Sequence, residues 1–257
     1  MEKFAIVTRY DETSKSIGEK IKETLTQKGY VFSEESPETV FVVGGDGTYI
    51  EAIHQYLDLI PNVKFLGLHT GTLGFFTEYQ DNELDDLLQM YMSNEYKVLE
   101  FPLLAVQAGD KVYHAVNEVR VENVSRTQVL DVYLSGEYLE RFRGTGMCVC
   151  TQLGSTAYNR SLGGAVIQDG LDLIELTEIA GIHHSKYRSL YAPLILKKET
   201  EVVLKSESFC KAILGVDANT YTLDQEQELK IKVCDCKHVR MIKGKSISYF
   251  KKLSTLF

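Results

Sequence analysis

Short apolar runs alternate with helical patterns through the first hundred residues. Three runs have the length and composition of buried strands: residues 3–8, 40–43 and 64–68. After each run, apolar residues recur every three or four positions, as on one face of a helix: residues 17–25, 50–57 and 82–92. Gly29 follows the first of these stretches like a C-terminal cap. The alternation predicts a parallel sheet covered by helices.

The pattern changes to a period of two from about residue 101. Val119 and Val121 alternate with polar residues, and residues 131–142 resemble a hairpin that turns at Ser135–Gly136. A helical stretch is predicted to interrupt the strands near residues 155–182. Further strand patterns follow it, at residues 201–204, 210–216, 220–223 and 229–233. The second half of the chain is therefore predicted to be mainly β.

These two patterns predict two domains. We expect an α/β N-terminal domain with a parallel sheet over residues 1–100, followed by a mainly β C-terminal domain over residues 101–257. Packing of the extreme C-terminus back on the first domain is left open. With four prolines and no low-complexity stretch, the chain has no visible flexible linker. The domains are therefore expected to pack closely, and a cleft between domains is a common place for a ligand.

The composition limits the partners that we expect. Of the 257 residues, 44% are hydrophobic and 25% are charged, which is ordinary for a soluble globular protein. The formal net charge of −8 argues against binding nucleic acid through overall charge, although backbone N–H groups can still bind an anion locally. No apolar stretch approaches the ~20 residues of a membrane helix, and no signal-peptide pattern is present. We expect a cytoplasmic protein without a nucleic-acid or membrane partner.

The cysteines and histidines show no metal-binding spacing. The five cysteines are an odd number without a CxxC pair, which argues against a disulfide framework. Cys148 with Cys150, and Cys234 with Cys236, would share a strand face, and we expect them to fill the core. His183–His184 has no accompanying carboxylate or thiolate motif, so a surface or interface pair is favoured.

The segment Gly44-Gly45-Asp46-Gly47-Thr48 carries the clearest chemistry. It stands between a predicted strand and a predicted helix, where glycines let a phosphate approach the backbone and the helix offers free N–H groups to an anion. A carboxylate in such a loop could accept the proton of an attacking hydroxyl or help to place Mg²⁺. The alternative is a Gly-Asp-Gly turn in which Asp46 only caps the helix.

Four motifs, in order along the chain, resemble those of the NAD kinase family in its bacterial form. The GGDGT string is shared by NAD kinases, diacylglycerol and sphingosine kinases and, in variant form, phosphofructokinases. Three further segments select among these families, because the lipid kinases lack the last two: His69-Thr70-Gly71-Thr72-Leu73-Gly74-Phe75, Asn117-Glu118, and Gly154-Ser155-Thr156-Ala157-Tyr158 continuing to Gly163-Gly164-Ala165. The resemblance covers nearly the whole chain.

The resemblance implies an NAD kinase-like fold and the phosphorylation of the adenosine-ribose 2′-hydroxyl of NAD by ATP with Mg²⁺ or another divalent cation. It implies Asp46 as the catalytic residue. It implies an ATP and phosphate site at Gly44, Gly45, Asp46, Gly47, Thr48, Gly71 and Gly74. It implies an NAD site at Asp46, Gly47, Phe75, Asn117, Glu118, Thr145, Thr156, Ala157, Tyr158, Ser161, Ala180 and Ile182. It also implies self-association, as a homotetramer or dimer.

Taken by themselves, the same residues allow plainer interpretations. Phe75 could be an ordinary core residue, and a Ser/Thr loop such as residues 154–158 is usually a helix cap. Asn117 and Glu118 are adjacent on a predicted strand, so they face opposite sides unless a bulge or a strand end reorients them. Without the resemblance, a solvated strand end is the favoured interpretation of that pair. His69 fits either a place near phosphates or a strand end.

Two positions depart from the family pattern. Bacterial members usually read G-D-G where this chain has Gly144-Thr145-Gly146, and their aspartate reaches the nicotinamide carboxamide from a neighbouring subunit. Thr145 keeps a hydroxyl without the charge, so we expect it to hold the nicotinamide end less tightly. Val216-Asp217 resembles a late V-D-G segment, but Ala218 replaces the glycine, so Asp217 is not ranked among the site residues.

Two other functions remain open at this stage. A lipid or sugar kinase could carry the same GGDGT loop, although a chain of charge −8 without a basic amphipathic helix has little with which to bind a membrane. A catalytically silent NAD(P)-binding sensor could carry all four motifs. The sequence also leaves open ATP or polyphosphate as the donor, and NAD or NADH as the acceptor.

Overall fold

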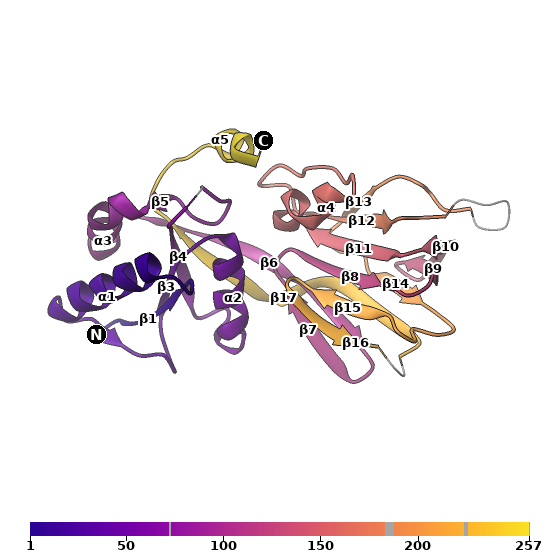
Figure 1. The fold of residues 1–257 in the computed structure, drawn as a ribbon, viewed down its shortest axis with the longest axis horizontal. Helices are drawn as coiled ribbons and strands as arrows, with labels where there is room; N and C mark the ends of the chain where they lie inside the picture. The colour runs from indigo at the N-terminus through magenta and orange to yellow at the C-terminus, as the bar shows by residue number, and fades with distance from the viewer. Residues whose placement is uncertain (72, 183–187, 224–225, 257) are drawn as a thin grey trace. The chain divides into compact units, whose positions relative to one another are not determined.

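The computed structural model describes residues 1–71, 73–182, 188–223 and 226–256. The chain divides into two compact units, Met1–Phe101 with Cys236–Phe257, and Pro102–Asp235 (Figure 1). It passes between them along two long strands, β6 (Lys97–Ala108) and β17 (Glu228–Lys243). None of the helices in the described ranges is long and apolar enough to cross a membrane.

The first unit contains the parallel sheet that the apolar runs predict. Its strands lie in the order β17, β4, β3, β1, β2, and β5 pairs with the end of β4. All of these neighbours are parallel, and β17 joins through Arg240 and Met241. The bounds are β1 Lys3–Thr8, β2 Val31–Phe32, β3 Thr39–Val43, β4 Lys64–His69 and β5 Tyr79–Gln80. Every residue of β3 is buried, which explains its continuous apolar run.

Helices cover this sheet, as the alternation predicts. They are α1 (Glu12–Gln27), α2 (Asp46–Gln55) and α3 (Leu84–Met92), with 3₁₀ turns at Leu57–Leu59 and Asp81–Glu83. The unit also contains α5 (Tyr249–Leu253) and a 3₁₀ turn at Ser254–Leu256, near the C-terminus. The Asp11 carboxylate caps α1 by accepting from the Ser14 N–H at 2.9 Å, and Gly29 follows the helix at φ +89°. Ile21 and Leu25 are fully buried against the strands.

The second unit contains an antiparallel sheet, and its candidate residues lie on β8 or close to the ends of β8, β11 and β12. The strand order is β13, β12, β11, β8, β15, β16. The bounds are β8 Glu118–Glu122, β11 Gly146–Thr151, β12 Leu173–Ile179, β13 Leu194–Lys197, β15 Ile213–Val216 and β16 Asn219–Thr222. In Figure 1, β8, β11, β12 and β13 lie side by side.

The remaining strands of the second unit form the other side of its core. β9 (Gln128–Leu134) and β10 (Glu137–Gly144) form the predicted hairpin, and positive φ at both Ser135 and Gly136 fits a type I′ turn. β14 (Val202–Lys205) pairs with β9 and with the first part of β17, and β7 (Lys111–Ala115) pairs with β6. One apolar cluster joins side chains from both sheets, among them Val119, Val149, Val132, Leu204 and Leu229. The mainly β prediction is confirmed.

Two predictions about local structure were wrong, and one confirmed strand is longer than predicted. The helical stretch near residues 155–182 is only a 3₁₀ turn (Leu153–Thr156) and α4 (Tyr158–Ser161), because residues 173–179 pair on both sides as β12. The strand predicted at 229–233 extends through Lys243, since β17 pairs with β14 at one end and with β4 at the other. Cys236 is exposed, whereas Cys148, Cys150 and Cys234 are buried as expected.

Candidate functional site

In the first unit, the GGDGT loop turns directly from β3 into α2. Gly45 occupies the N-cap position with an extended backbone, and no side chain caps the helix. Asp46 is the first helical residue, so the interpretation of Asp46 as the helix cap was wrong. Gly47 is exposed and Thr48 is buried. The turn therefore presents backbone at the start of a helix, where N–H groups favour an anion.

The Asp46 carboxylate binds the backbone of a second loop instead. Its Oδ2 accepts from the Phe75 N–H at 2.8 Å and its Oδ1 from the Phe76 N–H at 3.1 Å. A Cβ at Gly74 would lie 2.1 Å from Asp46 Oδ1, so this close approach requires glycine. The structure thus brings Asp46, Gly74 and Phe75 together, although 28 or more residues separate Asp46 from the loop in sequence. Charge-assisted bonds of this kind are the stronger ones in proteins.

The two phenylalanines of that loop have different environments. Phe76 is buried and stacks on Tyr49 with ring centroids 5.2 Å apart, which makes Phe76 the core residue. Phe75 is half-buried. At the start of the loop, His69 ends β4, and its Nδ1 lies 2.9 Å from the Gly71 carbonyl. Gly71 is exposed, and Thr72 lies outside the described residues.

A buried charge cluster follows the loop. Glu78 is 7% exposed and forms ion pairs with Lys252 at 3.1 Å and Lys243 at 3.8 Å. Burial, reinforced by the like charge of Lys252, lowers the pKa of Lys243 to about 8. Two cationic groups therefore share one buried carboxylate within the first unit.

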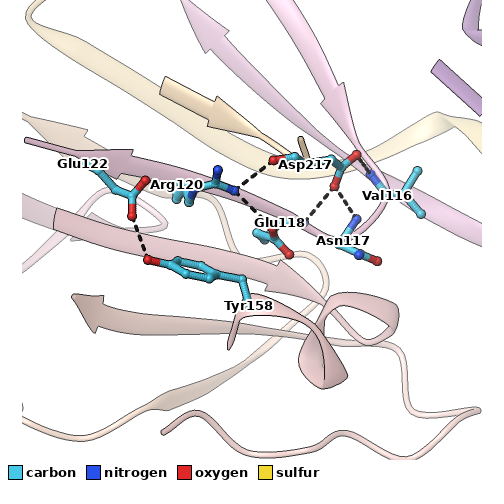
Figure 2. Close-up of polar contacts among 7 residues, drawn as sticks. All are labelled: Val116, Asn117, Glu118, Arg120, Glu122, Tyr158 and Asp217. Atoms are coloured by element: carbon cyan, nitrogen blue, oxygen red, sulfur yellow. Dashed lines mark hydrogen bonds and ion pairs between the residues drawn. The ribbon is translucent and has the colours of Figure 1, made fainter. Parts of the chain in front are cut away.

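In the second unit, Asn117 and Glu118 lie at the start of β8, as Figure 2 shows. The Asp217 carboxylate accepts three consecutive backbone N–H groups, from Val116 at 2.8 Å, Asn117 at 2.7 Å and Glu118 at 3.2 Å. Asp217 reaches them from the turn between β15 and β16, where its φ is +51°. Asn117 and Glu118 are 8% and 5% exposed, so the interpretation as a solvated strand end was wrong.

Each of these two side chains has a buried oxygen without a hydrogen-bond partner. Among the described residues, nothing bonds Asn117 Oδ1 or Glu118 Oε2. Buried polar atoms are almost always hydrogen-bonded, so two neighbouring unsatisfied acceptors indicate a site for a ligand that donates. Burial, together with the nearby Asp217 carboxylate, raises the pKa of Glu118 to about 7.

A polar network extends along β8 to Tyr158 (Figure 2). Arg120 donates to Glu118 Oε1 at 3.2 Å, to Glu122 Oε2 at 2.9 Å and to the Asp217 carbonyl at 2.9 Å. The Tyr158 hydroxyl donates to Glu122 Oε1 at 2.8 Å, and the Arg120 guanidinium lies 5.1 Å from the Tyr158 ring centroid. Burial and the bond to Glu122 raise the pKa of Tyr158 to about 12. The network holds the Tyr158 ring against Arg120 and Glu122.

The G-S-T-A-Y loop packs tightly behind Asn117. A Cβ at Gly154 would lie 2.1 Å from the Asn117 carbonyl oxygen, so only glycine fits. Ser155 is fully buried, donates to the Gln152 carbonyl at 2.7 Å and accepts from the Ile167 N–H at 3.0 Å, which is a structural role. Thr156 and Ala157 are half-buried, and Ser161 is exposed.

A third group of candidates lies directly after the ends of β10 and β12. The Thr145 N–H donates to the Ile179 carbonyl at 3.0 Å, and the Ile182 N–H donates to the Arg143 carbonyl at 2.7 Å. Thr145 is half-buried, while Ala180 and Ile182 are exposed. The structure therefore brings Thr145, Ala180 and Ile182 to one place. His183–His184 lies outside the described residues.

Asp217, Arg120 and Glu122 are parts of the second site that the sequence analysis did not rank. The alternation of Glu118, Arg120 and Glu122 could have revealed the network, because alternate residues of a strand share a face. Nothing local in the sequence links Asp217 to Asn117. Within the described part of the chain, no three His, Cys, Asp or Glu side chains form a cluster that could hold a metal ion.

Replacing Glu118 with glutamine should change how stability depends on pH. The folded-state pKa of about 7 lies above the ordinary 4.5, so the folded state gives up this proton less readily and loses stability as pH rises through that interval. A glutamine side chain cannot ionise. Relative to wild type, Glu118→Gln should therefore gain about 2–3 kcal/mol of unfolding free energy between pH 5 and pH 8.

Urea unfolding at both pH values measures this difference, with the exposed Glu137→Gln as the control. A stability difference that stays the same at pH 5 and pH 8 would show that the Glu118 carboxyl titrates in its ordinary range.

The chain is similar to known NAD kinases in both of its units. A family model of the ATP-NAD kinase N-terminal domain matches residues 4–96, and one of the ATP-NAD kinase C-terminal domain matches residues 116–243. NAD kinase 1 of Bacillus cereus is 33% identical over 261 residues, covering 99% of this chain and 98% of that protein. The NAD kinase of Lactobacillus acidophilus is 40% identical over 200 residues, covering 76% and 74%.

Solved structures share the fold across almost the whole chain. A yeast NADH kinase complexed with NADH superposes with a TM-score of 0.82 at 20% identity, covering 99% of this chain and 86% of its own. An NAD kinase from Archaeoglobus fulgidus in complex with ATP superposes with a TM-score of 0.80 at 24% identity, covering 98% and 99%. With relatives above 30% identity along its full length and both domains matched, the chain belongs to the NAD kinase family.

Proposed function

We propose that this protein transfers the γ-phosphoryl group of ATP to the 2′-hydroxyl of the adenosine ribose of NAD, which gives NADP. The observation that carries the proposal is the pair of buried, unsatisfied acceptors Asn117 Oδ1 and Glu118 Oε2. A ribose offers hydroxyl donors, and each of these two oxygens can accept a hydrogen bond from one. Asp217 fixes the backbone beneath both side chains, so the acceptors are positioned before the ligand binds.

The glycine loops of the first unit suit the donor. Gly44 and Gly45 lead into α2 and Gly47 lies in its first turn, while Gly71 and Gly74 precede Phe75 in the loop that Asp46 binds. Backbone N–H groups and a helix N-terminus favour the phosphates of ATP there. Phosphoryl transfer needs mainly positioning and electrostatic stabilisation, and the GGDGT loop supplies both without a protein nucleophile.

Asp46 is the residue that we assign to the proton transfer. The ribose 2′-oxygen bonds to the γ-phosphorus, the bond from that phosphorus to ADP breaks, and the hydroxyl proton passes to the Asp46 carboxylate. The Phe75 and Phe76 N–H groups hold both carboxylate oxygens. Each oxygen keeps a further lone pair for the hydroxyl or for a cation, since an ionised carboxylate accepts about four hydrogen bonds.

The donor set at this loop fits a divalent cation that ATP itself carries. Mg²⁺ is usually held by one or two carboxylates together with substrate phosphates, and Asp46 supplies one carboxylate beside the glycine loop. When bound, the cation would offset charge on the transferred phosphoryl group. Asp46 is thus the one protein ligand that we assign to it.

Incubation of the pure protein with MgATP and NAD tests the proposal directly, with NADP measured by an NADP-specific dehydrogenase. We expect NADP to form, and diacylglycerol, sphingosine and fructose 6-phosphate to remain unlabelled with γ-labelled ATP. Label in a lipid or sugar phosphate without any NADP would favour the other GGDGT kinases. Binding of NAD without turnover would favour a sensor.

Asp46→Asn should fold and bind NAD but lose at least ~10²-fold in kcat, because it removes the proton acceptor while one amide oxygen still faces the Phe75–Phe76 backbone. Steady-state kinetics, with NAD binding measured by calorimetry, tests this. The exposed Asp85→Asn in α3 is the control. Turnover of Asp46→Asn close to that of the control would remove Asp46 from the catalytic role.

Thr145→Asp should lower the KM for NAD several-fold and leave kcat unchanged. Family members with aspartate at this position are expected to hydrogen-bond the nicotinamide carboxamide. A hydrogen bond to a charged acceptor contributes about 1 kcal/mol more to binding than one to a neutral acceptor. Both backbone groups of Thr145 are already bonded, to Ile179 and Asn123, so the substitution alters the side chain alone. Kinetics with NAD varied at saturating MgATP measures the change, with Thr222→Asp as the control for added charge. An equal or higher KM would show that position 145 does not contact nicotinamide.

A further inference from the structure

The end of the chain contacts the same loop that Asp46 binds. Within the first unit, residues 243–255 donate hydrogen bonds to residues 73–78. Lys252 Nζ donates to the Phe75 carbonyl at 3.4 Å and to Glu78 Oε1 at 3.1 Å, and Lys243 Nζ donates to the Phe76 carbonyl at 2.9 Å. The Lys245 N–H donates to Glu78 Oε2 at 3.1 Å, and Thr255 Oγ1 donates to the Leu73 carbonyl at 3.3 Å. The Tyr249 ring meets the Phe75 ring edge-on at 5.9 Å. The loop is therefore held between Asp46 and the C-terminal segment.

One peptide group connects the two sides. The carbonyl of Phe75 accepts from Lys252 Nζ, and the N–H of Phe76 donates to Asp46 Oδ1 at 3.1 Å. That carbonyl and that N–H belong to the same planar peptide unit, and in a trans peptide they point in opposite directions. Fixing the carbonyl on Lys252 therefore fixes the direction of the N–H toward Asp46. A chain of hydrogen bonds through a polarised peptide also strengthens its members.

Burial makes this arrangement hard to change. Lys252 is 8% exposed, and an ammonium group out of water must keep its hydrogen-bond acceptors. Its acceptors are the Phe75 carbonyl and Glu78. Lys243, which lies in the same cluster, holds the next carbonyl along, that of Phe76. Rotation of the Phe75–Phe76 peptide would leave the Lys252 ammonium short of an acceptor and Asp46 Oδ1 short of a donor.

We infer that Lys252 is a positioning residue for Asp46, through the Phe75–Phe76 peptide, so that the C-terminal helix α5 takes part in phosphoryl transfer without touching the substrates. The inference rests on the proposed function, in which Asp46 receives the proton. It distinguishes Lys252 from a lysine that only stabilises the fold, because its effect must pass through the Asp46 carboxylate.

Lys252→Met tests the inference, since methionine keeps the length of the side chain and removes the donor. Lys252→Arg keeps a charged donor. Lys251→Met is the matched control, because Lys251 is the neighbouring exposed residue of the same helix. Thermal melts establish that each variant is folded, and Lys252→Leu, which also removes the donor, replaces Lys252→Met if the latter does not fold.

The expected result is a fall of about tenfold in kcat for Lys252→Met with little change in the KM for NAD, as for a misplaced catalytic group. Lys252→Arg should recover most of the rate and Lys251→Met should match wild type. In a double-mutant cycle, Lys252→Met should cost less than about twofold when Asp46 is already asparagine, because residues that act as a unit are not additive. End-point assays of NADP over long incubation reach the low rates that this cycle needs.

Two outcomes would overturn the inference: an unchanged kcat in Lys252→Met, or the same proportional loss in the wild-type and Asp46→Asn backgrounds. Both differ from a failure of the proposed function, in which the wild-type protein itself forms no NADP.

Discussion

A single carboxylate in each unit accepts hydrogen bonds from consecutive backbone N–H groups, and the candidate sites are built on these two residues. Asp46 binds the N–H groups of Phe75 and Phe76, and Asp217 binds those of three residues that begin at Val116. Phe75 and Phe76 lie between β4 and β5, and Val116 and Asn117 directly precede β8. An ionised carboxylate can serve several donors at once, and its bonds are stronger than neutral ones. Each carboxylate thus gives a loop one defined conformation.

Close approach to these loops explains two of the motif glycines. Gly74 lies against the Asp46 carboxylate, and Gly154 lies against the backbone of Asn117. A side chain at either position would push away the group that the site needs. The glycine motifs therefore reflect packing around the functional residues as well as space for phosphate.

The two sites differ in electrostatics in a way that suits their proposed ligands. At the first, glycine-rich backbone and the start of a helix favour anionic phosphates, and the nearby lysines of the Glu78 cluster are occupied by protein acceptors. At the second, Asn117 and Glu118 present acceptor oxygens, which suit the hydroxyl donors of a ribose. The raised pKa of Glu118 is the cost of placing an acidic side chain where water is excluded.

The sequence by itself determined the alternation of strands and helices in the first unit, the hairpin at Ser135–Gly136 and the motifs that identify the family, because these depend on short-range periodicity, turn chemistry and the residues at fixed spacing. It did not determine β12, where pairing on both sides overrode a helical pattern, or the full length of β17. Only the tertiary structure decided that Asp46 binds residues 75–76, that Asp217 supports Asn117 and Glu118 from about 100 positions away, and that Lys252 reaches Phe75. Those contacts join residues far apart in the chain, and nothing in a local pattern specifies which distant carboxylate or ammonium group will satisfy a buried backbone group.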